Sequence, residues 1–340
     1  GAEEAHPTGS LLDKVPELVS GAKRLFHVMG TNQALDERLI ATLDEMRLRS
    51  RRGANPASQI VDPRETLHEM RIVKSQDELA IMRRAAAISH EAHHEAAKLA
   101  HPGHHEFEIE AMLDFTFRRR GAAGPAYNSI VGGGANATIL HYVQNDQPLH
   151  EGDLLLIDAG CELEGYASDV TRTYPVGGHF GSPHRDVYQL VLDAQQAALE
   201  AATPGVTLDD VHKAALRILV AGMLELDLLK GDVDTCIANE SYRRYYMHGT
   251  SHWLGLDVHD AGAYSVDGKP RALAPGIAFT IEPGLYIPAD DDEAPEALRG
   301  IGVRIEDDVV ITETGHENLT AAIPKEVQDI EAWVQEGAGS

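Results

Sequence analysis

The sequence has few cysteines and lacks any long apolar run. Only Cys161 and Cys236 occur among its 340 residues, so a disulfide framework is excluded and a reducing compartment, the cytoplasm, is expected. We expect both cysteines to be small buried hydrophobes. No apolar run approaches the ~18 residues that a membrane-spanning helix needs. A membrane is therefore not an expected partner.

Basic residues are also scarce relative to acidic ones. Lysine and arginine number 29 against 54 aspartates and glutamates, which gives a formal net charge of −25. Such a surface repels phosphate backbones, so nucleic acid is not an expected partner, whereas cations are compatible with it. Apolar residues make up 43% and charged residues 24%, as in ordinary globular proteins. The length predicts two domains, or one large domain with an appendage.

The chain shows the same order of elements twice. After a segment of mixed character (residues 1–72), the capping box Ser75-Gln76-Asp77-Glu78 predicts the start of a helix. That helix carries an apolar stripe on one face, formed by Ile81, Ala85, Ile88, Ala92 and Leu99, and its ends are set by the capping box and by Pro102-Gly103. The remaining predictions are a helix over 105–120, strands near 127–131, 138–143, 153–158 and 168–174, a helix capped by Ser182, a helix opened by Thr207-Leu208-Asp209-Asp210, strands near 247–258, 278–287 and 302–312, and a closing helix near 324. This order favours an α+β fold with duplicated halves.

Four acidic residues occur in strand contexts that should bury them: Asp158, Asp169, Glu282 and Glu306. Buried acids need partners, and crowded carboxylates raise one another's pKa unless a cation compensates them. One neighbouring arginine, Arg304, cannot neutralise the charge of four carboxylates. Each acid taken singly also fits an ordinary strand end, so spacing alone leaves their convergence open.

Histidines add nitrogen ligands to this set. His248, His252 and His259 lie within twelve residues, and His141 lies in another predicted strand. An oxygen-rich set with one imidazole suits Mn²⁺ or Mg²⁺, with Co²⁺ or Zn²⁺ as alternatives. Two divalent ions would balance the charge of four carboxylates.

Five segments that contain these residues resemble, in order, the signatures of the pita-bread metallopeptidases. They are Asp158–Gly160, Ser168–Thr173, His248–Asp260, Ile281–Tyr286 and Gly302–Asp308. The resemblance covers roughly residues 65–330 and is strongest to the bacterial Xaa-Pro aminopeptidases (aminopeptidase P). It implies a pita-bread fold preceded by part of a smaller N-terminal α/β domain. The boundaries expected are 1–72 for the partial domain and linker, 73–332 for the catalytic domain and 333–340 for a tail.

The same resemblance implies a dinuclear metal centre. Its ligands would be Asp158, Asp169, His252, Glu282 and Glu306. Asp169 and Glu306 would bridge two divalent ions, with Mn²⁺ favoured over Co²⁺ and Zn²⁺. Asp158 would complete one metal site, and His252 with Glu282 would complete the other.

The implied function is release of the first residue from peptides that have proline in second position. A metal-bridging hydroxide would attack the first carbonyl carbon, and His259 would hydrogen-bond its oxygen. Glu282 would carry the proton to the leaving nitrogen. His141 and His248 match catalytic and substrate-binding histidines, and Arg304 and Tyr286 match substrate-binding positions around the site. The resemblance also implies a homo-oligomer, a dimer or a tetramer.

Other functions remain open at this point. A prolidase, which cuts Xaa-Pro dipeptides, has nearly the same local motifs, and a non-catalytic pita-bread module would bind partners only. The pattern His90-Glu91-Ala92-His93-His94 matches the zinc-protease motif H-E-x-x-H. We expect a polar helix surface there instead, because His90 and His94 lie opposite the apolar stripe of their helix.

Overall fold

A computed structural model describes residues 4–53 and 55–338 of the chain. The chain divides into two compact units, Gly1–Met70 and Arg71–Ser340. The first unit contains one parallel strand pair, in which Arg24 is paired with Gln59 and Phe26 with Val61. Its small core is formed by Val15, Val19, Leu39, Leu43 and Ala57. The elements are η1 (Thr8–Ser10), α1 (Leu11–Leu18), β1 (Arg24–Phe26), α2 (Gln33–Leu48), η2 (Ser50–Arg52), β2 (Gln59–Val61) and α3 (Arg64–Ile72), which leads into the second unit.

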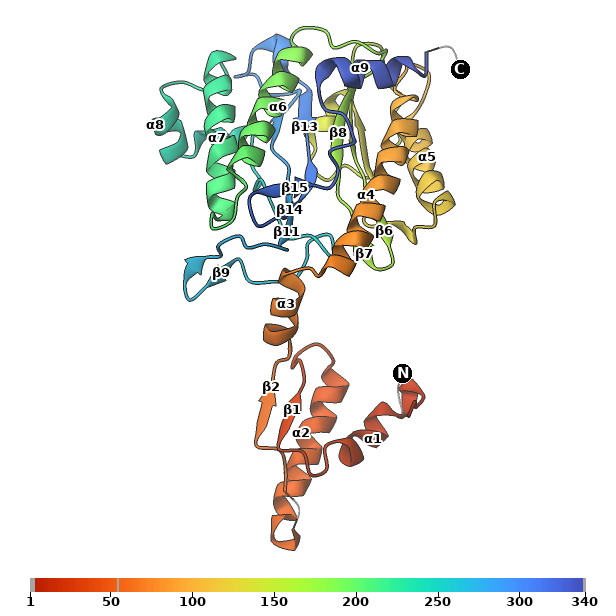
Figure 1. The fold of residues 1–340 in the computed structure, drawn as a ribbon, viewed down its shortest axis with the longest axis vertical. Coiled ribbons are helices and arrows are strands. Elements are labelled where there is room, and N and C mark those ends of the chain that lie inside the picture. The colour runs from red at the N-terminus through yellow and green to blue at the C-terminus, as the bar shows by residue number, and fades with distance from the viewer. Residues whose placement is uncertain (1–3, 54, 339–340) are drawn as a thin grey trace. The chain divides into compact units, whose positions relative to one another are not determined.

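The second unit begins with two packed helices followed by antiparallel strands (Figure 1). Its central sheet has the strand order β4-β5-β8. The elements of this half are α4 (Gln76–Ala97), α5 (Glu106–Arg119), β3 (Gly124–Pro125), β4 (Ile130–Gly133), η3 (Gly134–Thr138), β5 (Leu154–Asp158), β6 (Cys161–Leu163), β7 (Tyr166–Ala167) and β8 (Thr171–Pro175).

The other half repeats the order with a second helix pair, α6 and α7, packed side by side (Figure 1). Its sheets have the orders β11-β14-β15 and β12-β13. The elements are α6 (His184–Ala201), α7 (Leu208–Glu225), α8 (Val233–Ala238), η4 (Ser241–Arg244), β9 (Ser265–Val266), β10 (Lys269–Pro270), β11 (Ala278–Ile281), β12 (Gly284–Ile287), η5 (Glu296–Leu298), β13 (Ile301–Arg304), β14 (Asp307–Ile311), β15 (His316–Asn318) and α9 (Val327–Gln335). The predicted α+β fold with duplicated halves is confirmed.

Helix α4 forms as its sequence predicts. The Ser75 side chain accepts a hydrogen bond from the Glu78 backbone, and the Glu78 carboxylate accepts one from the Ser75 backbone. These two bonds satisfy amide groups that would otherwise have no partner at the helix start. Ala85 and Ala92 of the predicted stripe are fully buried, and the stripe packs into the main core of the unit.

The opposite face of α4 differs from the prediction. His90 and His94 are half-buried rather than solvent-exposed, because the Trp333 ring of α9 lies 5.4 Å and 4.6 Å from their rings, centroid to centroid. His94 Nε2 also lies 2.8 Å from Glu336 Oε2. The histidines of the H-E-x-x-H pattern therefore hold α9, which continues past residue 332, against α4.

Three local predictions are wrong. Residues 138–143 form the end of a 3₁₀ turn and irregular chain, not a strand. Residues 247–258 are irregular as well, with a single bridge from Trp253 to Phe279. Ser182 does not cap α6, whose first residue is His184 and whose N-cap is Pro183. Apolar alternation in these segments reflects burial against neighbouring sheets, which does not require ladder hydrogen bonds.

Most buried apolar side chains of the second unit form one large core between the helices and the sheets, and two smaller clusters lie beside it. Cys161 and Cys236 are both buried and unpaired, as expected. Among the residues that the structure describes, no helix combines the length and the apolar character needed to cross a bilayer. The β4-β5-β8 sheet and the β12-β13 pair approach each other where Glu306 N donates to Thr171 O at 3.0 Å. The two halves of the unit therefore meet beside the acidic residues.

Candidate active site

The four acids singled out in the sequence all lie where a strand ends or is interrupted. Asp158 is the last residue of β5, and Asp169 lies two residues before β8. Glu282 separates β11 from β12, and Glu306 separates β13 from β14. At such positions the chain leaves the ladder, so a side chain can point out of the packed layer while its backbone stays held by the flanking strands.

His252 joins these acids from the irregular segment before β11. Its Nε2 atom lies 3.4 Å from Asp169 Oδ2 and 3.4 Å from Glu282 Oε1. Asp169, His252 and Glu306 each offer a ligand atom, and these atoms all lie within 4.8 Å of one another. Among the described residues, this is the group of ligand atoms close enough to hold a metal ion.

A cavity of about 670 Å³ opens over this group. All five predicted ligands line it: Asp158, Asp169, His252, Glu282 and Glu306. The other predicted site residues on its lining are His141, His248, His259 and Arg304. Tyr286 is not on the lining. It is fully buried, and its hydroxyl lies 2.8 Å from His248 Nε2 and 2.9 Å from Arg304 Nη1.

Both nitrogens of His248 already have partners within the protein. Nδ1 lies 2.8 Å from the Gly249 carbonyl, so this nitrogen carries a proton. Arg304 donates to the Tyr286 hydroxyl, which leaves that hydroxyl to donate to His248 Nε2. Burial and the charge of Arg304 lower the pKa of His248 to about 4, so the ring is neutral at pH 7.

The acids are electrostatically unfavourable without a cation. Burial raises the pKa of Asp158, with a further contribution from Asp169. Burial also raises the pKa of Glu282 to about 7 and that of Glu306 well above its usual range. Arg304, whose Nη2 lies 2.6 Å from Asp158 Oδ2, is the cation that offsets part of this cost.

This donor set fits divalent cations. Burial alone would lower the pKa of His252, but the carboxylates of Asp169 and Glu282 raise it to about 9. Without a cation, the His252 ring therefore binds a proton at the nitrogen that would otherwise bind a metal. A bound cation would replace that proton and stabilise the ionised carboxylates. Four carboxylates and one imidazole form a hard, oxygen-rich set of the kind that Mn²⁺ accepts.

Three residues that the sequence analysis did not assign hold the acids in place. The Tyr127 hydroxyl lies 2.5 Å from both Asp158 Oδ1 and Asp169 Oδ1. The Thr171 hydroxyl donates to Glu306 Oε2 at 2.6 Å, and Asp308 accepts the Asp169 backbone N–H at 3.1–3.2 Å. A lone tyrosine has no spacing signal, whereas Thr171 and Asp308 lie inside the motifs and could have been chosen for their position.

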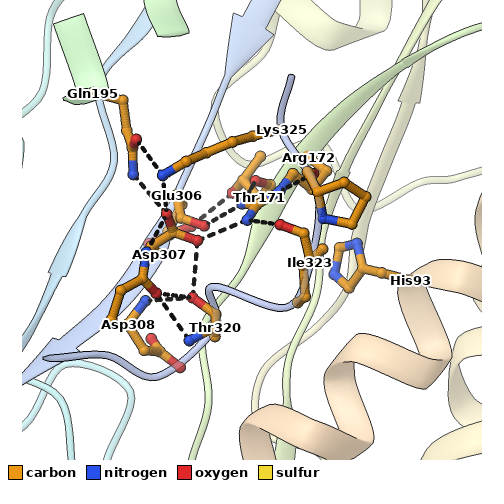
Figure 2. Close-up of polar contacts among 12 residues, drawn as sticks. His93, Thr171, Arg172, Gln195, Glu306, Asp307, Asp308, Thr320, Ile323 and Lys325 are labelled. Carbon is orange, nitrogen blue, oxygen red and sulfur yellow. Dashed lines mark hydrogen bonds and ion pairs between the residues drawn. The ribbon is translucent and has the colours of Figure 1, made fainter. Parts of the chain in front are cut away.

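A buried ion pair lies behind Glu306. Arg172 and Asp307 are both fully buried, and Arg172 Nη2 lies 2.7 Å from Asp307 Oδ1 (Figure 2). Arg172 uses all five of its N–H groups. They donate to Asp307 Oδ1 and to the carbonyl oxygens of Thr171, Glu306, Ile323 and Pro324. This side chain therefore ties the strand after Asp169, the strand after Glu306 and the approach to α9 together.

Asp307 collects the remaining charge and hydrogen bonds of this cluster. Lys325 Nζ and Gln195 Nε2 each donate to Asp307 Oδ2 at 2.8 Å, and the Thr320 hydroxyl donates to Oδ1 at 2.9 Å (Figure 2). The cations Arg172 and Lys325 outweigh the effect of burial and hold the pKa of Asp307 far below its usual range. This acid therefore stays ionised and is saturated with partners, unlike the acids that line the cavity.

The sequence profile of metallopeptidase family M24 matches residues 80–313, which contain every predicted ligand. The chain belongs to metallopeptidase family M24. It is 45% identical over 332 residues to the Xaa-Pro aminopeptidase of Escherichia coli (strain K12), which covers 98% of this chain and 75% of that protein. It is 50% identical over 274 residues to the Xaa-Pro aminopeptidase of Haemophilus influenzae, which covers 81% of this chain and 63% of that protein.

Solved structures agree with this M24 assignment. The aminopeptidase PepP of Pseudomonas aeruginosa superimposes with a TM-score of 0.95 at 46% identity, over 100% of this chain and 77% of that one. A substrate complex of E. coli aminopeptidase P gives a TM-score of 0.94 at 43% identity, over 100% of this chain and 77% of that one. The chain is a metal-dependent peptidase of the Xaa-Pro aminopeptidase type, and the resemblance read from the motifs is confirmed.

Proposed function

We propose that this M24 peptidase releases the first residue from peptides with proline in second position and uses two divalent cations to do so. Asp158, Asp169, His252, Glu282 and Glu306 would hold the ions, and ligand atoms of Asp169, His252 and Glu306 lie within 4.8 Å of one another. The observation that carries this assignment is the convergence of five donors, far apart in the chain, on one cavity.

The metals would supply two things when bound: polarisation of the scissile carbonyl group and activation of the attacking water at neutral pH. We assign Mn²⁺ as the working ion, with Co²⁺ and Zn²⁺ as substitutes, because carboxylate oxygens dominate the donor set. The chain's own residues would do the rest, which is to orient the peptide and to move a proton.

Glu282 is the residue that we assign to proton transfer. The contacts of its carboxylate are long: 3.4 Å to His252 Nε2, 3.4 Å to the Thr280 hydroxyl and 3.7 Å to His248 Nδ1. It is therefore less committed to structural hydrogen bonds than Asp158 or Glu306. In this role Glu282 accepts a proton from the attacking water and gives it to the nitrogen of the leaving proline.

Histidines would orient the substrate on either side of the acids. The His259 ring stands edge-on to His252 at a centroid distance of 4.4 Å, which places it beside the centre. From there it would hydrogen-bond the carbonyl oxygen as negative charge develops. His141 lines the cavity from the loop after η3 and would contact the bound peptide.

Apolar side chains on the lining support binding of a proline ring. Ile130, Leu140, Val143 and Val258 line the same cavity as the acids. A proline nitrogen bears no hydrogen and its ring restricts the backbone, so a pocket that accepts the ring can select this bond. Arg304, with Tyr286 and His248 behind it, would complete the polar part of that pocket.

The deciding experiment compares substrates after metal exchange. The protein is stripped with a chelator, reloaded with Mn²⁺ and assayed on matched Xaa-Pro-Yaa, Xaa-Ala-Yaa and Xaa-Pro peptides. We expect metal-dependent cleavage of Xaa-Pro-Yaa that exceeds cleavage of Xaa-Ala-Yaa by at least about 100-fold. Preference for the dipeptide would mean that the chain is a prolidase. Absence of cleavage with Mn²⁺ bound would favour the non-catalytic module.

Two further properties stay predictions. We propose a cytoplasmic location, from the two unpaired cysteines, and a homo-oligomer, a dimer or a tetramer, from the resemblance to the family. Light scattering on the purified protein tests the second, and a monomer at micromolar concentration would contradict it.

A further inference from the structure

One wall of the active-site cavity has almost no regular structure. After the 3₁₀ turn η3 (Gly134–Thr138), residues 139–148 form turns and irregular chain. Leu140, His141 and Val143 from this segment line the cavity. Residues 134–148 are here called the wall loop. A segment without ladder hydrogen bonds needs other contacts to hold a fixed shape.

A buried carboxylate supplies a cluster of those contacts. The fully buried Asn145 supplies two more, because its side chain donates to Ser129 O and accepts from Val131 N. Glu106, the first residue of α5, is fully buried. Its Oε1 atom accepts hydrogen bonds from Gly133 N at 2.7 Å and from Asn136 Nδ2 at 2.9 Å. Its Oε2 atom accepts from the Tyr142 hydroxyl at 2.8 Å and from Gln147 N at 2.9 Å.

Three of these donors come from the start, the middle and the end of the wall loop, and the fourth, Gly133, comes from the residue directly before it. Gly133 and Asn136 precede the cavity-lining residues, Tyr142 lies among them, and Gln147 follows them. The Glu106 backbone N–H also donates to Gln147 O at 3.0 Å. Tyr142 is the next residue after His141. The hydrogen bond from the Tyr142 hydroxyl to Glu106 therefore holds the backbone directly beside His141.

All four of these partners offer a hydrogen to Glu106. Two are backbone N–H groups, one is the Asn136 amide and one is the Tyr142 hydroxyl. The carboxylate therefore collects donors around the wall loop, away from the metal ligands.

We propose that Glu106 is a positioning residue for the peptidase reaction: its buried carboxylate holds the wall loop, and with it His141, in the shape that receives substrate. Glu106 does not line the cavity, so it acts through the loop. The inference rests on the proposed function only in that His141 is taken to contact the peptide.

Glu106→Gln tests this with two independent measurements. The amide keeps one acceptor for Gly133 and Asn136 but turns its NH₂ group towards the Gln147 N–H donor. We expect amide hydrogen exchange over residues 134–147 to become at least about tenfold faster, while strand β5 and the midpoint of Mn²⁺ binding stay unchanged. We expect kcat/KM on Xaa-Pro-Yaa to fall about tenfold, mainly through KM.

A double-mutant cycle with His141→Ala separates positioning from general destabilisation. If Glu106 acts through the loop, Glu106→Gln costs little more activity in the His141→Ala background than His141→Ala does alone. Additive losses would overturn the proposal, as would unchanged exchange of the wall loop. The matched control is Glu108→Gln, a more exposed carboxylate on the same helix turn, which should leave exchange of the loop and kcat/KM unaltered.

The outcomes also distinguish this inference from the proposed function. A wild-type protein that loads Mn²⁺ and does not cleave Xaa-Pro-Yaa would contradict the function, and the exchange measurement would still decide the role of Glu106. If the Glu106→Gln protein does not fold, Glu106→Asp replaces it in the test, because aspartate keeps the carboxylate on a side chain that is one methylene shorter. We expect this variant to loosen the same loop, and unchanged exchange in it would overturn the proposal.

Discussion

Buried charged residues in this protein fall into two kinds that differ in how completely they are paired. Arg172 and Asp307 have every polar atom engaged, and neither lies on the cavity. Glu306 is buried and Glu282 is half-buried, but both carboxylates line the cavity with few hydrogen bonds, and the charge of each disfavours ionisation of the other. Full pairing is typical of a structural role, whereas crowded and weakly paired acids indicate a site that binds cations.

Substitution of Glu282 by glutamine should remove proton transfer while keeping the shape of the residue. We expect turnover of Xaa-Pro-Yaa to fall about 10²–10⁴-fold, because an amide cannot accept the proton of the attacking water. Steady-state kinetics, with metal content measured on the same sample, checks this. The exposed Glu296→Gln is the control, and full turnover by Glu282→Gln with metals bound would contradict the assigned role.

Removal of the charge of Arg172 should destabilise the protein strongly. Arg172→Met leaves Asp307 buried with less compensation and frees the four carbonyl oxygens that the guanidinium binds. We expect a loss of about 3–5 kcal/mol in the free energy of unfolding. Urea denaturation measures it, with the exposed Arg185→Met as a control that should change it by less than about 0.5 kcal/mol. A loss below about 1 kcal/mol for Arg172→Met would show that the cluster is dispensable.

At the scale of elements, helix α4 connects the core to the sheet that carries Asp158. His93 on this helix is fully buried, with Nε2 3.0 Å from the carbonyl of Ala159 and Nδ1 3.2 Å from the Tyr174 hydroxyl. The carbonyl can only accept, so Nε2 carries the proton and Nδ1 accepts from Tyr174. This arrangement fits a neutral ring, and burial lowers the pKa of His93 to about 4.

The neutral His93 predicts an acid-dependent loss of stability. Because its folded pKa of about 4 lies below the unfolded value near 6.5, the unfolded chain binds more protons between these values. Stability is therefore full above about pH 6.5 and falls as the pH drops, by up to about 3 kcal/mol near pH 4.

The test for His93 compares unfolding curves of the wild type and His93→Gln from pH 4 to pH 7. The stability difference between the two should shrink as the pH falls, because only the wild type pays for protonating the ring. His179→Gln, at an exposed histidine, should run parallel to the wild type. A pH-independent difference for His93→Gln would contradict the buried neutral ring.

At the scale of the whole molecule, the centre lies where the two halves of the second unit meet. Asp158 and Asp169 come from the first half, and His252, Glu282 and Glu306 come from the second. Few backbone hydrogen bonds cross between the β4-β5-β8 sheet and the β12-β13 pair. Cations bound at this seam would act as cross-links between the halves, in addition to their chemical role.

Metal loading should therefore stabilise the fold. At a free Mn²⁺ concentration of 100 Kd, binding to the folded state alone adds about 2.7 kcal/mol, which corresponds to a rise in Tm of roughly 5–10 °C for a unit of this size. Differential scanning calorimetry with Mn²⁺ and then with excess chelator measures this shift. Glu306→Gln should lose most of it, and an unchanged Tm in the wild type would contradict a resident metal at the seam.

Sequence patterns determined much of this protein in advance, because they reflect local physics. The capping box at Ser75, the helix start at Thr207, the apolar stripe of α4 and the apolar run of β5 follow from short-range preferences, and each appears where predicted. Acidic residues at predicted strand ends, together with the family resemblance, indicate the candidate ligand set from the sequence.

Only the tertiary structure decided the contacts between distant segments. No spacing places Tyr127 between Asp158 and Asp169, assigns Glu106 to the wall loop, or covers His90 and His94 with Trp333. The segments around His141 and His252 were predicted as strands because their sequences carry no signal of the distant contacts that make them irregular. The shape of these segments is set by contacts with side chains and sheets far away in the sequence. Such contacts stabilise the fold, but they impose no repeating pattern on the residues that form them.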